Sequence, residues 1–419
     1  MTLRAAYVLL WYPKPSETFL VTEVRGLRAR GLDLLVFTLY GPLSRGLTPE
    51  LRAEPGVERL GLGGLGRILG GLGHWLARKP GTVFSLLGRA LAAGLGGCSG
   101  DRGSLWSRLE KYGENLWALL SSFHLARRFQ DCGVTHIHAP WACGPATAAW
   151  AASRLTGIPF SFAGRARDVH PPDGLLPEKL RQAAFVRVIA RCNAEQLEIL
   201  GGLPPGTVQL IREILPWPDC PKAAARFAAP LHILGLGRFV GKKGFDDLLR
   251  ACRLLLDQGL DFRLTLAGDG PERARLLALA ERLGLRGRVE FPGFVTHAEA
   301  RRLLLAADLL AAPCRVEPSG DRDGLPMVLL EALLHCLPVV AADVADIGEL
   351  VQDGVTGLLV PQRDPESIAR AISRLAADRE SALNMARAGR QRVRDLFAPE
   401  VNLERLEALL QRSAGAEGR

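Results

Sequence analysis

The chain has 419 residues, of which 48% are hydrophobic and 23% charged, and its formal net charge is +9. This composition is typical of a globular protein and excludes a disordered or fibrous one. The length exceeds what one ordinary hydrophobic core supports, so we expect two domains of about 200 residues each.

The first residues predict a strand, a helix and a second strand. Ala5–Tyr12 is a short apolar run that suits a buried strand, and Leu32–Tyr40 suits the next one. Between them, Ser16 is a good helix N-cap and Glu17 falls in the first helical turn. Ligands of doubly wound α/β domains lie beyond the carboxyl ends of strands. Ser16 and Glu17 are therefore either plain capping residues or ligand-binding residues, and this pattern alone does not separate the two.

Residues 60–100 form a glycine-rich segment that is basic and apolar. Gly61–Gly66 has the pattern G-x-G-x-x-G, but we identify no clear strand before it. There is also no acidic residue between Glu58 and Asp101 to bind a ribose, so we expect no dinucleotide site. The glycines weaken any helix by up to about 1 kcal/mol each. The segment is therefore predicted to be an insertion, which is either mobile or lies on an anionic membrane interface.

Charged and aromatic residues follow the next two predicted strands. Val134–His138 predicts a strand with His136 and His138 on one side, and Trp141 follows it. The second of these strands is Pro159–Ala163. Its end is followed by a cluster of charged residues and a histidine: Arg165, Arg167, Asp168 and His170. Such a cluster at a strand end indicates a site, but no further Cys or His completes a zinc site with the two strand histidines.

A composition shift marks the predicted domain boundary. Leu180–Arg187 and Ala194–Leu200 have helical periodicity, and three prolines then occur within Leu215–Lys222. We therefore expect an N-terminal domain, a linker, a C-terminal domain, and a final helix with a tail that crosses back over the linker. The predicted bounds are 1–214, 215–230, 231–397 and 398–419.

The second half repeats the alternation of strands and helices. Strands are predicted at Leu231–Leu236, Phe262–Ala267, Val289–Phe291, Leu309–Ala312, Val339–Ala341 and Gly357–Val360. A helix is predicted at Pro365–Ala377. This alternation predicts a parallel sheet with helices on both faces. The fold class is therefore α/β, with two Rossmann-like doubly wound domains that face a central cleft.

A basic, glycine-rich loop follows the first of these strands. The chain has seven lysines, and two of them, Lys242 and Lys243, lie in this loop with Arg238. The loop lacks the spacing of a Walker A motif. Its backbone N–H groups, guanidinium and ammonium nevertheless suit a diphosphate. The alternative is an ordinary basic loop.

One carboxylate stands in a long apolar run. Glu331 is the only charged residue of Leu325–Ala342, a run that two prolines and this charge distinguish from a membrane span. Burial of an unpartnered carboxylate there would be costly. Pro326 suits a first helical turn, and Asp323 and Gly324 lie where the free N–H groups of that helix would point. We predict that Glu331 binds the hydroxyls of a ribose and that Asp323 binds a second sugar. The alternative partner of Glu331 is an internal arginine.

The positive charge and the cysteines give clues to partners and location. Residues 1–214 hold 25 Lys and Arg against 16 Asp and Glu, whereas residues 215–419 hold 28 of each. An anionic membrane surface or a phosphorylated acceptor suits this excess better than nucleic acid, because the arginines lack interleaved aromatic residues. The eight cysteines include no C-x-x-C pair, and Ala5–Tyr12 is too short for a signal peptide. We therefore expect a cytoplasmic protein with reduced thiols.

Several motifs resemble those of a known family. G-R-F-V-G-K-K-G-F-D-D-L-L and D-G-L-P-M-V-L-L-E-A-L look like the paired signatures of retaining glycosyltransferases of family 4, which have the GT-B fold. G-D-G-P-E, F-P-G-F-V and V-T-G-L-L-V-P extend the similarity over residues 231–376. In the first half, P-K-P-S-E-T-F, H-I-H-A-P-W-A-C-G-P-A-T and S-F-A-G-R-A-R-D-V are similar to the exopolysaccharide and colanic-acid-type branch.

The resemblance implies roles for individual residues. It places the acid-x7-acid motif of the family on Asp323 and Glu331 and its basic pair on Arg238 and Lys243, so these four are the predicted catalytic residues. The predicted donor-binding residues are Ser16, Glu17, Gly237, Phe294, Gly324, Leu325 and Pro326. The predicted acceptor-side residues are His138, Trp141, Arg165 and Asp168.

Two positions depart from the family pattern. Asp323 is shorter by one methylene than the usual Glu, which affects how the donor sugar is held. Arg165 replaces a histidine that in the family lies near the reacting sugar. An arginine can pair with a phosphate or a developing anion, but it cannot act as a base at neutral pH. We expect activity with an altered donor, with loss of activity as the alternative.

The sequence thus predicts a metal-independent, cofactor-free retaining glycosyltransferase of hexosyltransferase type. It would move a sugar from a nucleoside-diphosphate sugar to a glycan or polyprenyl-diphosphate-linked acceptor in cell-surface polysaccharide synthesis. The branch typically extends lipid-linked glycans on the cytoplasmic face, which implies a peripheral position on the inner face of the membrane. The alternatives are another GT-B enzyme, such as a sugar-nucleotide epimerase, and a non-catalytic sugar-nucleotide-binding protein.

Overall fold

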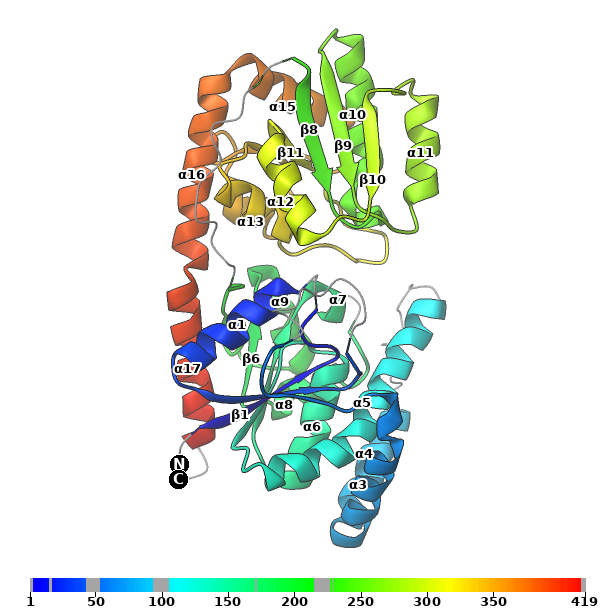
Figure 1. Ribbon diagram of the computed structural model, residues 1–419, viewed down its shortest axis with the longest axis vertical. Helices are drawn as coiled ribbons and strands as arrows, with labels where there is room; N and C mark the ends of the chain where they lie inside the picture. The colour runs from blue at the N-terminus through cyan, green and yellow to red at the C-terminus, as the bar shows by residue number, and fades with distance from the viewer. Residues whose placement is uncertain are drawn as a thin grey trace. The chain divides into compact units, whose positions relative to one another are not determined.

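The computed structural model describes residues 3–14, 17–42, 53–92, 105–169, 172–214, 227 and 229–415. The chain forms two compact units. The first unit comprises Met1–Pro216 and Pro399–Arg419, and the second comprises Trp217–Ala398. Each unit is a sheet covered by helices (Figure 1).

The first unit contains a seven-stranded parallel sheet in the order β3-β2-β1-β4-β5-β6-β7. Its strands are β1 (Arg4–Leu9), β2 (Asp33–Thr38), β3 (Val57–Arg59), β4 (His136–Ala139), β5 (Phe160–Gly164), β6 (Phe185–Val188) and β7 (Gln209–Leu210). The strand order reverses between β1 and β4. The carboxyl ends of the strands at such a switch point are where doubly wound sheets bind ligands.

Helices pack on both sides of this sheet. They are α1 (Thr18–Ala29), α3 (Leu65–Arg78), α4 (Pro80–Ala92), α5 (Leu105–Asp131), α6 (Gly144–Thr156), α7 (Ala166–Val169), α8 (Leu176–Gln182), α9 (Arg191–Gly201) and α17 (Pro399–Gly415), with a short 3-10 turn η1 (Leu62–Gly64). Helix α6 contacts α5 and strands β1, β4 and β5 over a core that includes Phe123, Phe129 and Trp150. Helix α17 contacts α1 and β4.

The second unit contains a six-stranded parallel sheet in the order β10-β9-β8-β11-β12-β13. Its strands are β8 (Leu231–Leu236), β9 (Phe262–Ala267), β10 (Val289–Gly293), β11 (Leu309–Ala312), β12 (Val339–Ala342) and β13 (Leu358–Val360). The order reverses between β8 and β11, so the loops that follow these two strands flank the switch point.

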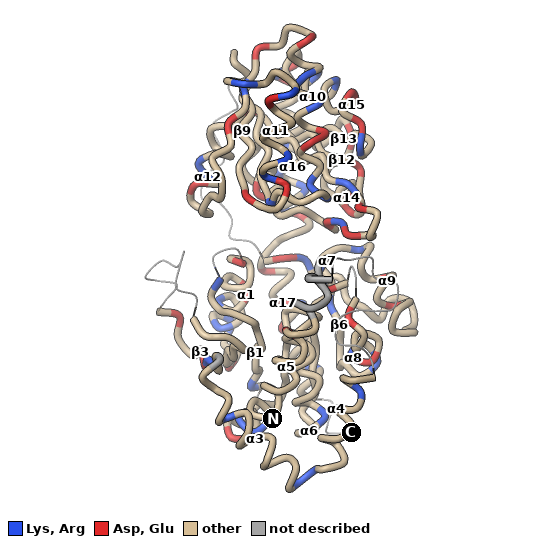
Figure 2. Tube along the Cα trace, turned by 90° about the vertical axis from the view of Figure 1, so that its right-hand side faces the viewer, with Lys and Arg blue, Asp and Glu red and all other residues tan. Residues whose placement is uncertain are grey.

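The helices of the second unit lie in two groups. They are η2 (Gly241–Lys243), α10 (Phe245–Asp257), α11 (Arg273–Arg282), α12 (His297–Ala306), α13 (Met327–Leu334), α14 (Ile347–Leu350), α15 (Pro365–Ala377) and α16 (Arg379–Phe397). Helix α10 contacts α11 and α15, whereas α13 contacts α16, β11 and β12. Lys and Arg are interspersed with Asp and Glu over this unit (Figure 2), in line with its balanced charge.

The predicted α/β class with two doubly wound domains is confirmed. Strands β8, β9 and β11 and helix α15 occupy the residues that the apolar runs predicted. The run Leu325–Ala342 contains α13 and β12, as a globular domain requires. Within the part of the chain that the structure describes, no helix is both long and apolar enough to span a membrane.

Two local predictions are wrong. The helix expected over Leu180–Arg187 ends at Gln182, and Phe185–Val188 is strand β6, because hydrogen bonds to β5 and β7 outweigh a weak local preference. The glycine-rich pattern does follow a strand: β3 pairs with β2 at the sheet edge but is too short to leave a periodic signal. The described part of the predicted insertion then forms the two helices α3 and α4.

Candidate functional site

The loops after β8 and β11 bring together predicted residues from distant parts of the second unit. The first loop, residues 237–244, carries Arg238 and Lys243 and leads into α10. The second loop, residues 313–326, carries Asp323 and leads into α13. Because both loops leave the carboxyl edge at the switch point, their side chains can meet there.

Lys243 and Asp323 form an ion pair between these loops. Nζ of Lys243 lies 2.6 Å from Oδ2 of Asp323, and the side chains are 16% and 17% exposed. Lys242 lies further out, with its Nζ 2.9 Å from Asp321 Oδ1 and 3.3 Å from Asp323 Oδ1. The ammonium of Lys243 is therefore the charged partner of Asp323 Oδ2.

Each charge of the Lys243–Asp323 ion pair stabilises the other and offsets the effect of burial on its pKa. Burial alone would raise the pKa of Asp323, but the ammonium groups of Lys243 and Lys242 outweigh it and lower the pKa to about 2. Burial likewise lowers the pKa of Lys243, and the carboxylate of Asp323 outweighs it and raises that pKa. Both side chains are therefore charged at neutral pH.

Gly237 gives the stem of Lys243 its space. Its φ is +156°, and a Cβ at this position would lie 3.2 Å from Cε of Lys243. A side chain there would be strained and would press on the lysine. Gly237 therefore permits the position of Lys243, and its own donor-binding role stays a prediction.

Arg238 is an exposed cation beside this pair. Among the described residues, its guanidinium has no ion-pair or hydrogen-bond partner. An exposed guanidinium next to a lysine at the carboxyl edge of a parallel sheet suits a diphosphate.

Helix α13 carries Glu331 next to the second loop. The helix begins at Met327, one residue later than predicted, so Pro326 occupies the N-cap position and not the first helical turn. Pro326 and the two residues before it, Gly324 and Leu325, are buried. Glu331 is half-buried, and within the described residues its carboxylate contacts neither an arginine nor any other hydrogen-bonding or charged group. Burial raises its pKa to about 7.

Phe294 lies apart from these residues in the sheet. It follows β10, two strands from β8, and is 73% exposed. Its predicted donor-binding role therefore stays a prediction.

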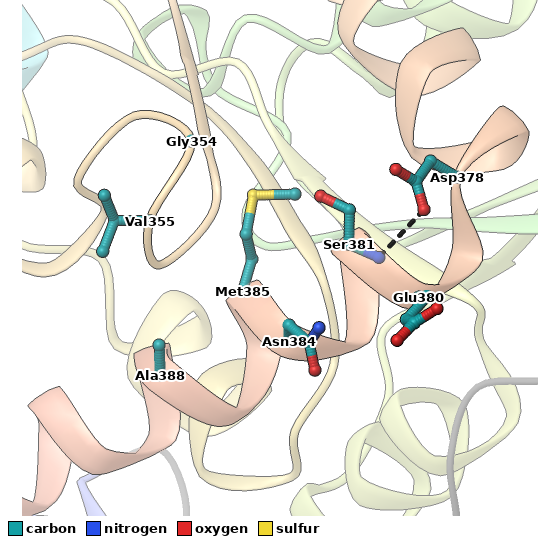
Figure 3. A pocket seen from close by; sticks show the side chains of 8 residues that line it. All are labelled: Gly354, Val355, Asp378, Glu380, Ser381, Asn384, Met385 and Ala388. Atoms are coloured by element: carbon teal, nitrogen blue, oxygen red, sulfur yellow. Dashed lines mark hydrogen bonds between the residues drawn. The ribbon is translucent and has the colours of Figure 1, made fainter.

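A hollow of about 570 Å³ lies elsewhere on the second unit, at the start of α16 (Figure 3). It is lined by carboxylates such as Asp378 and Glu380, and none of its lining residues is basic. An acidic hollow does not suit a diphosphate. We therefore place the candidate site at the two switch-point loops and not in this hollow.

In the first unit, the predicted cap of α1 differs by one residue. Glu17, not Ser16, occupies the N-cap position, and the helix begins at Thr18. Oε1 of Glu17 lies 2.5 Å from Nζ of Lys14. Ser16 lies outside the described residues, so its donor-binding role stays a prediction, as does that of Glu17.

Arg165 is buried inside the first unit, where other groups of the protein hold its guanidinium. Its Nε and Nη2 donate to the two carboxylate oxygens of Glu213 at 2.9 and 3.2 Å. Nη1 donates to the Pro140 carbonyl. Its guanidinium carbon lies 5.0 Å from the ring centre of Phe19 and 4.9 Å from that of Trp141. These contacts use three of its five N–H donors, and the two aromatic rings pack against the guanidinium.

Two further predicted acceptor-side residues are also buried. His138 is fully buried; its Nδ1 lies 2.7 Å from Ser161 Oγ, and burial lowers its pKa far below the usual range. Asp168 accepts from the Ala142 amide at 2.9 Å and from Cys143 Sγ at 3.0 Å, and burial raises its pKa. His138, Arg165 and Asp168 are thus all buried within the first unit, and their acceptor-side roles stay predictions. Of the four acceptor-side predictions, only Trp141 keeps exposed surface.

The described residues contain no group of three or more His, Cys, Asp or Glu side chains arranged to hold a metal ion.

The sequence did not indicate other charged residues near the site. Asp246 and Asp247 at the start of α10 bind Arg315, which follows β11. Acidic residues are common in the first turn of a helix, so the local sequence did not indicate that Asp246 and Asp247 pair with Arg315.

Comparison with known proteins supplies the family. The model of the glycosyl transferases group 1 family matches residues 222–392. WcaL of Escherichia coli, assigned as a glycosyltransferase of colanic acid biosynthesis, is 33% identical over 277 residues, which are 57% of this chain and 68% of that protein. Its counterpart in Salmonella typhimurium is 27% identical over 429 residues and covers 98% of this chain and 100% of that protein.

Solved structures share the fold. HepE of Anabaena, in complex with UDP and glucose, is 18% identical and superposes with a TM-score of 0.67 over 97% of this chain and 99% of that one. A sucrose-phosphate synthase of Thermosynechococcus elongatus is 19% identical, with a TM-score of 0.68 over 99% and 100%. These likenesses show that the chain has the GT-B fold.

Proposed function

Because the chain belongs to the group 1 glycosyl transferases, we propose that it transfers a hexose from a nucleoside-diphosphate sugar to a glycan or polyprenyl-diphosphate-linked acceptor, with retention of the anomeric configuration. The relatives assigned to colanic acid biosynthesis support a place in cell-surface polysaccharide synthesis. A neighbour in fold that binds UDP supports a nucleotide donor.

The observation that carries the proposal is the set of charges at the switch point of the second unit. Lys243 and Asp323 meet there at 2.6 Å, Arg238 lies exposed beside them, and Glu331 has no partner within the described residues. Two cations suit a diphosphate, and two carboxylates suit the hydroxyls of a ribose and a sugar. We assign Glu331 to the ribose and Asp323 to the donor sugar.

The chemistry of the transfer sets what these residues do. The bond between the anomeric carbon and the diphosphate oxygen breaks, and a bond to the acceptor oxygen forms on the same face of the sugar. The acceptor proton passes to the leaving diphosphate. Arg238 and Lys243 stabilise the charge that develops on that diphosphate, as preorganised cations do. Because Arg238 and Lys243 supply positive charge at the diphosphate, the reaction that we propose uses neither a metal nor a cofactor.

The experiment is a donor screen with the purified protein. UDP-, GDP- and dTDP-hexoses are incubated with and without lipid-linked and free glycan acceptors, and the anomeric configuration of the product is read by NMR. We expect acceptor-dependent transfer with the configuration of the donor retained. An epimerised sugar nucleotide formed without acceptor would favour an epimerase instead. Binding of a sugar nucleotide without any turnover would favour a non-catalytic binding protein.

We also propose that helices α3 and α4 rest on an anionic membrane surface. Neither helix carries an acidic residue. Both expose large apolar side chains: Leu65, Leu69, Leu76, Phe84 and Leu91. Arg67 and Arg78 add charge, and each basic residue near an anionic leaflet contributes about 1 kcal/mol. This surface would hold the enzyme at the inner face of the membrane, next to a lipid-linked acceptor.

Vesicle flotation tests this surface. The double variant Leu69→Ser/Phe84→Ser is expected to lower binding to phosphatidylglycerol vesicles by tenfold or more, since burial of each side chain contributes about 1.5–3 kcal/mol. Ile199→Ser is the matched control, because Ile199 is the most exposed of the large apolar side chains described and lies on α9. Equal flotation of the double variant and the control would contradict the membrane surface, as would equal binding to neutral phosphatidylcholine vesicles.

A further inference from the structure

The loops after β8 and β11 are joined by a second set of contacts, distinct from the Lys243–Asp323 ion pair. Arg315 follows β11 and is 8% exposed. Its Nη1 lies 2.9 Å from Asp246 Oδ1 and 3.2 Å from Asp247 Oδ2. These aspartates directly follow the first loop, at the start of α10. One guanidinium of the second loop therefore bridges two carboxylates next to the first.

Backbone contacts occur at the same place. The amide of Arg315 donates to the carbonyl of Lys242 at 2.9 Å. Gly244 has a φ of +66°, and a Cβ there would lie 1.9 Å from the Pro313 carbonyl oxygen. Glycine alone tolerates both this left-handed conformation and this approach. The two loops thus touch on either side of Lys243.

The aspartates depend on arginines for their charge balance. Burial alone would raise the pKa of Asp246, but Arg315, Arg275 and Arg250 outweigh it and the pKa is lowered. For Asp247, burial and the neighbouring Asp246 raise the pKa more than the arginines lower it. Among the described arginines that contact these carboxylates, only Arg315 comes from the second loop and is buried.

A bound donor would affect the contacts of Arg315 with Asp246 and Asp247 less than the Lys243–Asp323 ion pair. We call these contacts of Arg315 the bridge. In the proposed transfer, Lys243 turns to the diphosphate and Asp323 to the sugar, so their mutual attraction weakens. Arg315 has its guanidinium on Asp246, Asp247 and Glu317 and takes no part in those contacts. Its bridge therefore remains when the donor is bound.

On the basis of the proposed function, we infer that Arg315 is a positioning residue, which holds Lys243 and Asp323 at the donor by bridging the two loops. It contacts neither of these side chains. Its buried guanidinium contacts both aspartates through Nη1 and Glu317 through Nε, which gives the fixed geometry that catalysis by placed charges requires.

Three variants test this inference. Arg315→Met removes the charge, Arg315→Lys keeps it without the fork, and Arg250→Met is the matched control. Arg250 contacts the same two carboxylates at 3.2 and 3.1 Å, but it lies on α10 itself and is 45% exposed. We expect Arg315→Met to lower kcat/KM for the donor by about tenfold to 100-fold, as small misplacements of catalytic groups do.

The kinetic split separates positioning from mere instability. Loss of folded protein lowers the apparent kcat and leaves KM unchanged, whereas displaced charges raise the donor KM as well. We expect that rise in Arg315→Met, a partial return in Arg315→Lys, and a change of less than about twofold in Arg250→Met. Equal KM values in Arg315→Met, Arg250→Met and wild type would overturn the inference.

Hydrogen–deuterium exchange without donor tests the bridge separately from the function. Amides of residues 237–244 and 313–326 should exchange faster in Arg315→Met than in Arg250→Met, because the loops lose their link. If wild type neither binds nor turns over any donor, the proposed function fails, and the exchange result alone decides on the bridge. Unchanged exchange in both loops would overturn the bridge whatever the activity.

Discussion

Replacing Lys243 with methionine is expected to lower kcat/KM for the donor by about 100-fold to 1,000-fold. Methionine keeps most of the length of the stem over Gly237 but removes the ammonium. Loss of one preorganised group that meets developing charge costs about this much in other enzymes. Steady-state kinetics with the best donor of the screen measure the effect.

The neighbouring lysine provides the control. Lys242 bears the same charge, but its ammonium lies 2.9 Å from Asp321 and 3.3 Å from Asp323. Lys242→Met is expected to cost less than about tenfold, as a screened ion pair does. An equal loss in both variants would mean that the general positive potential of the loop matters, and the specific role of Lys243 would then be wrong.

The same variant has a signature in stability. Asp323 has a pKa of about 2, below its ordinary value of 3.8, so the ion pair stabilises wild type above about pH 4. That contribution is lost as the pH falls through 2, where Asp323 takes up a proton. Urea unfolding should therefore show Lys243→Met to be less stable at pH 7 by about 1–3 kcal/mol, with the gap narrowing below pH 4.

Apolar runs and turn chemistry made much of the second unit predictable. Strand β11 and nearly all of β8 are buried on both faces, so they appear in the sequence as mainly apolar stretches, whereas β9 carries the exposed Arg263. Pro326 and the apolar run after it predicted a loop followed by a helix, and Asp323 lies in that loop and Glu331 in that helix. The strand order then places the basic loop and this helix at one switch point, as doubly wound topology requires.

What the sequence hid are pairings between distant residues. Arg165 and Glu213 are 48 residues apart, and Arg315 and Asp246 are 69 apart. The chain has many arginines and acids, so no local pattern selects these partners. The burial of His138 was hidden for a similar reason, because its position on a strand shows only that it shares a side with His136. Strand β6 was hidden because its pairing with β5 and β7 is not local.

Replacing Glu331 with glutamine is expected to abolish most donor turnover and yet stabilise the folded protein at alkaline pH. The carboxylate is half-buried without a partner among the described residues, and its pKa is raised from 4.5 to about 7. The folded state therefore holds a proton between pH 4.5 and 7 that the unfolded state has lost. Wild-type stability falls as the pH rises through this window and stays lower above it.

Glutamine carries no charge at any pH, so the difference in folding stability between Glu331→Gln and wild type should depend on pH in a defined way. Near pH 4.5 both proteins carry a neutral side chain, and we expect equal stability; by pH 8 the variant should be more stable by about 1–3 kcal/mol. Glu281→Gln, an exposed carboxylate on α11, is the control and should change stability at neither pH.

Donor binding should show the opposite trend. An ionised Glu331 accepts hydrogen bonds from two ribose hydroxyls, and a carboxylate accepts more strongly than an amide. Donor affinity of wild type should therefore rise between pH 6 and 8, whereas that of Glu331→Gln should be lower and flat. If Glu331→Gln is more stable at pH 8 but keeps full turnover, the buried carboxylate destabilises the protein without binding the ribose, and the proposed role is wrong. If instead the stability of Glu331→Gln at pH 8 equals that of wild type, the carboxylate of Glu331 has a partner in solution. Its burial then has no cost, and the argument that assigns Glu331 to the ribose fails.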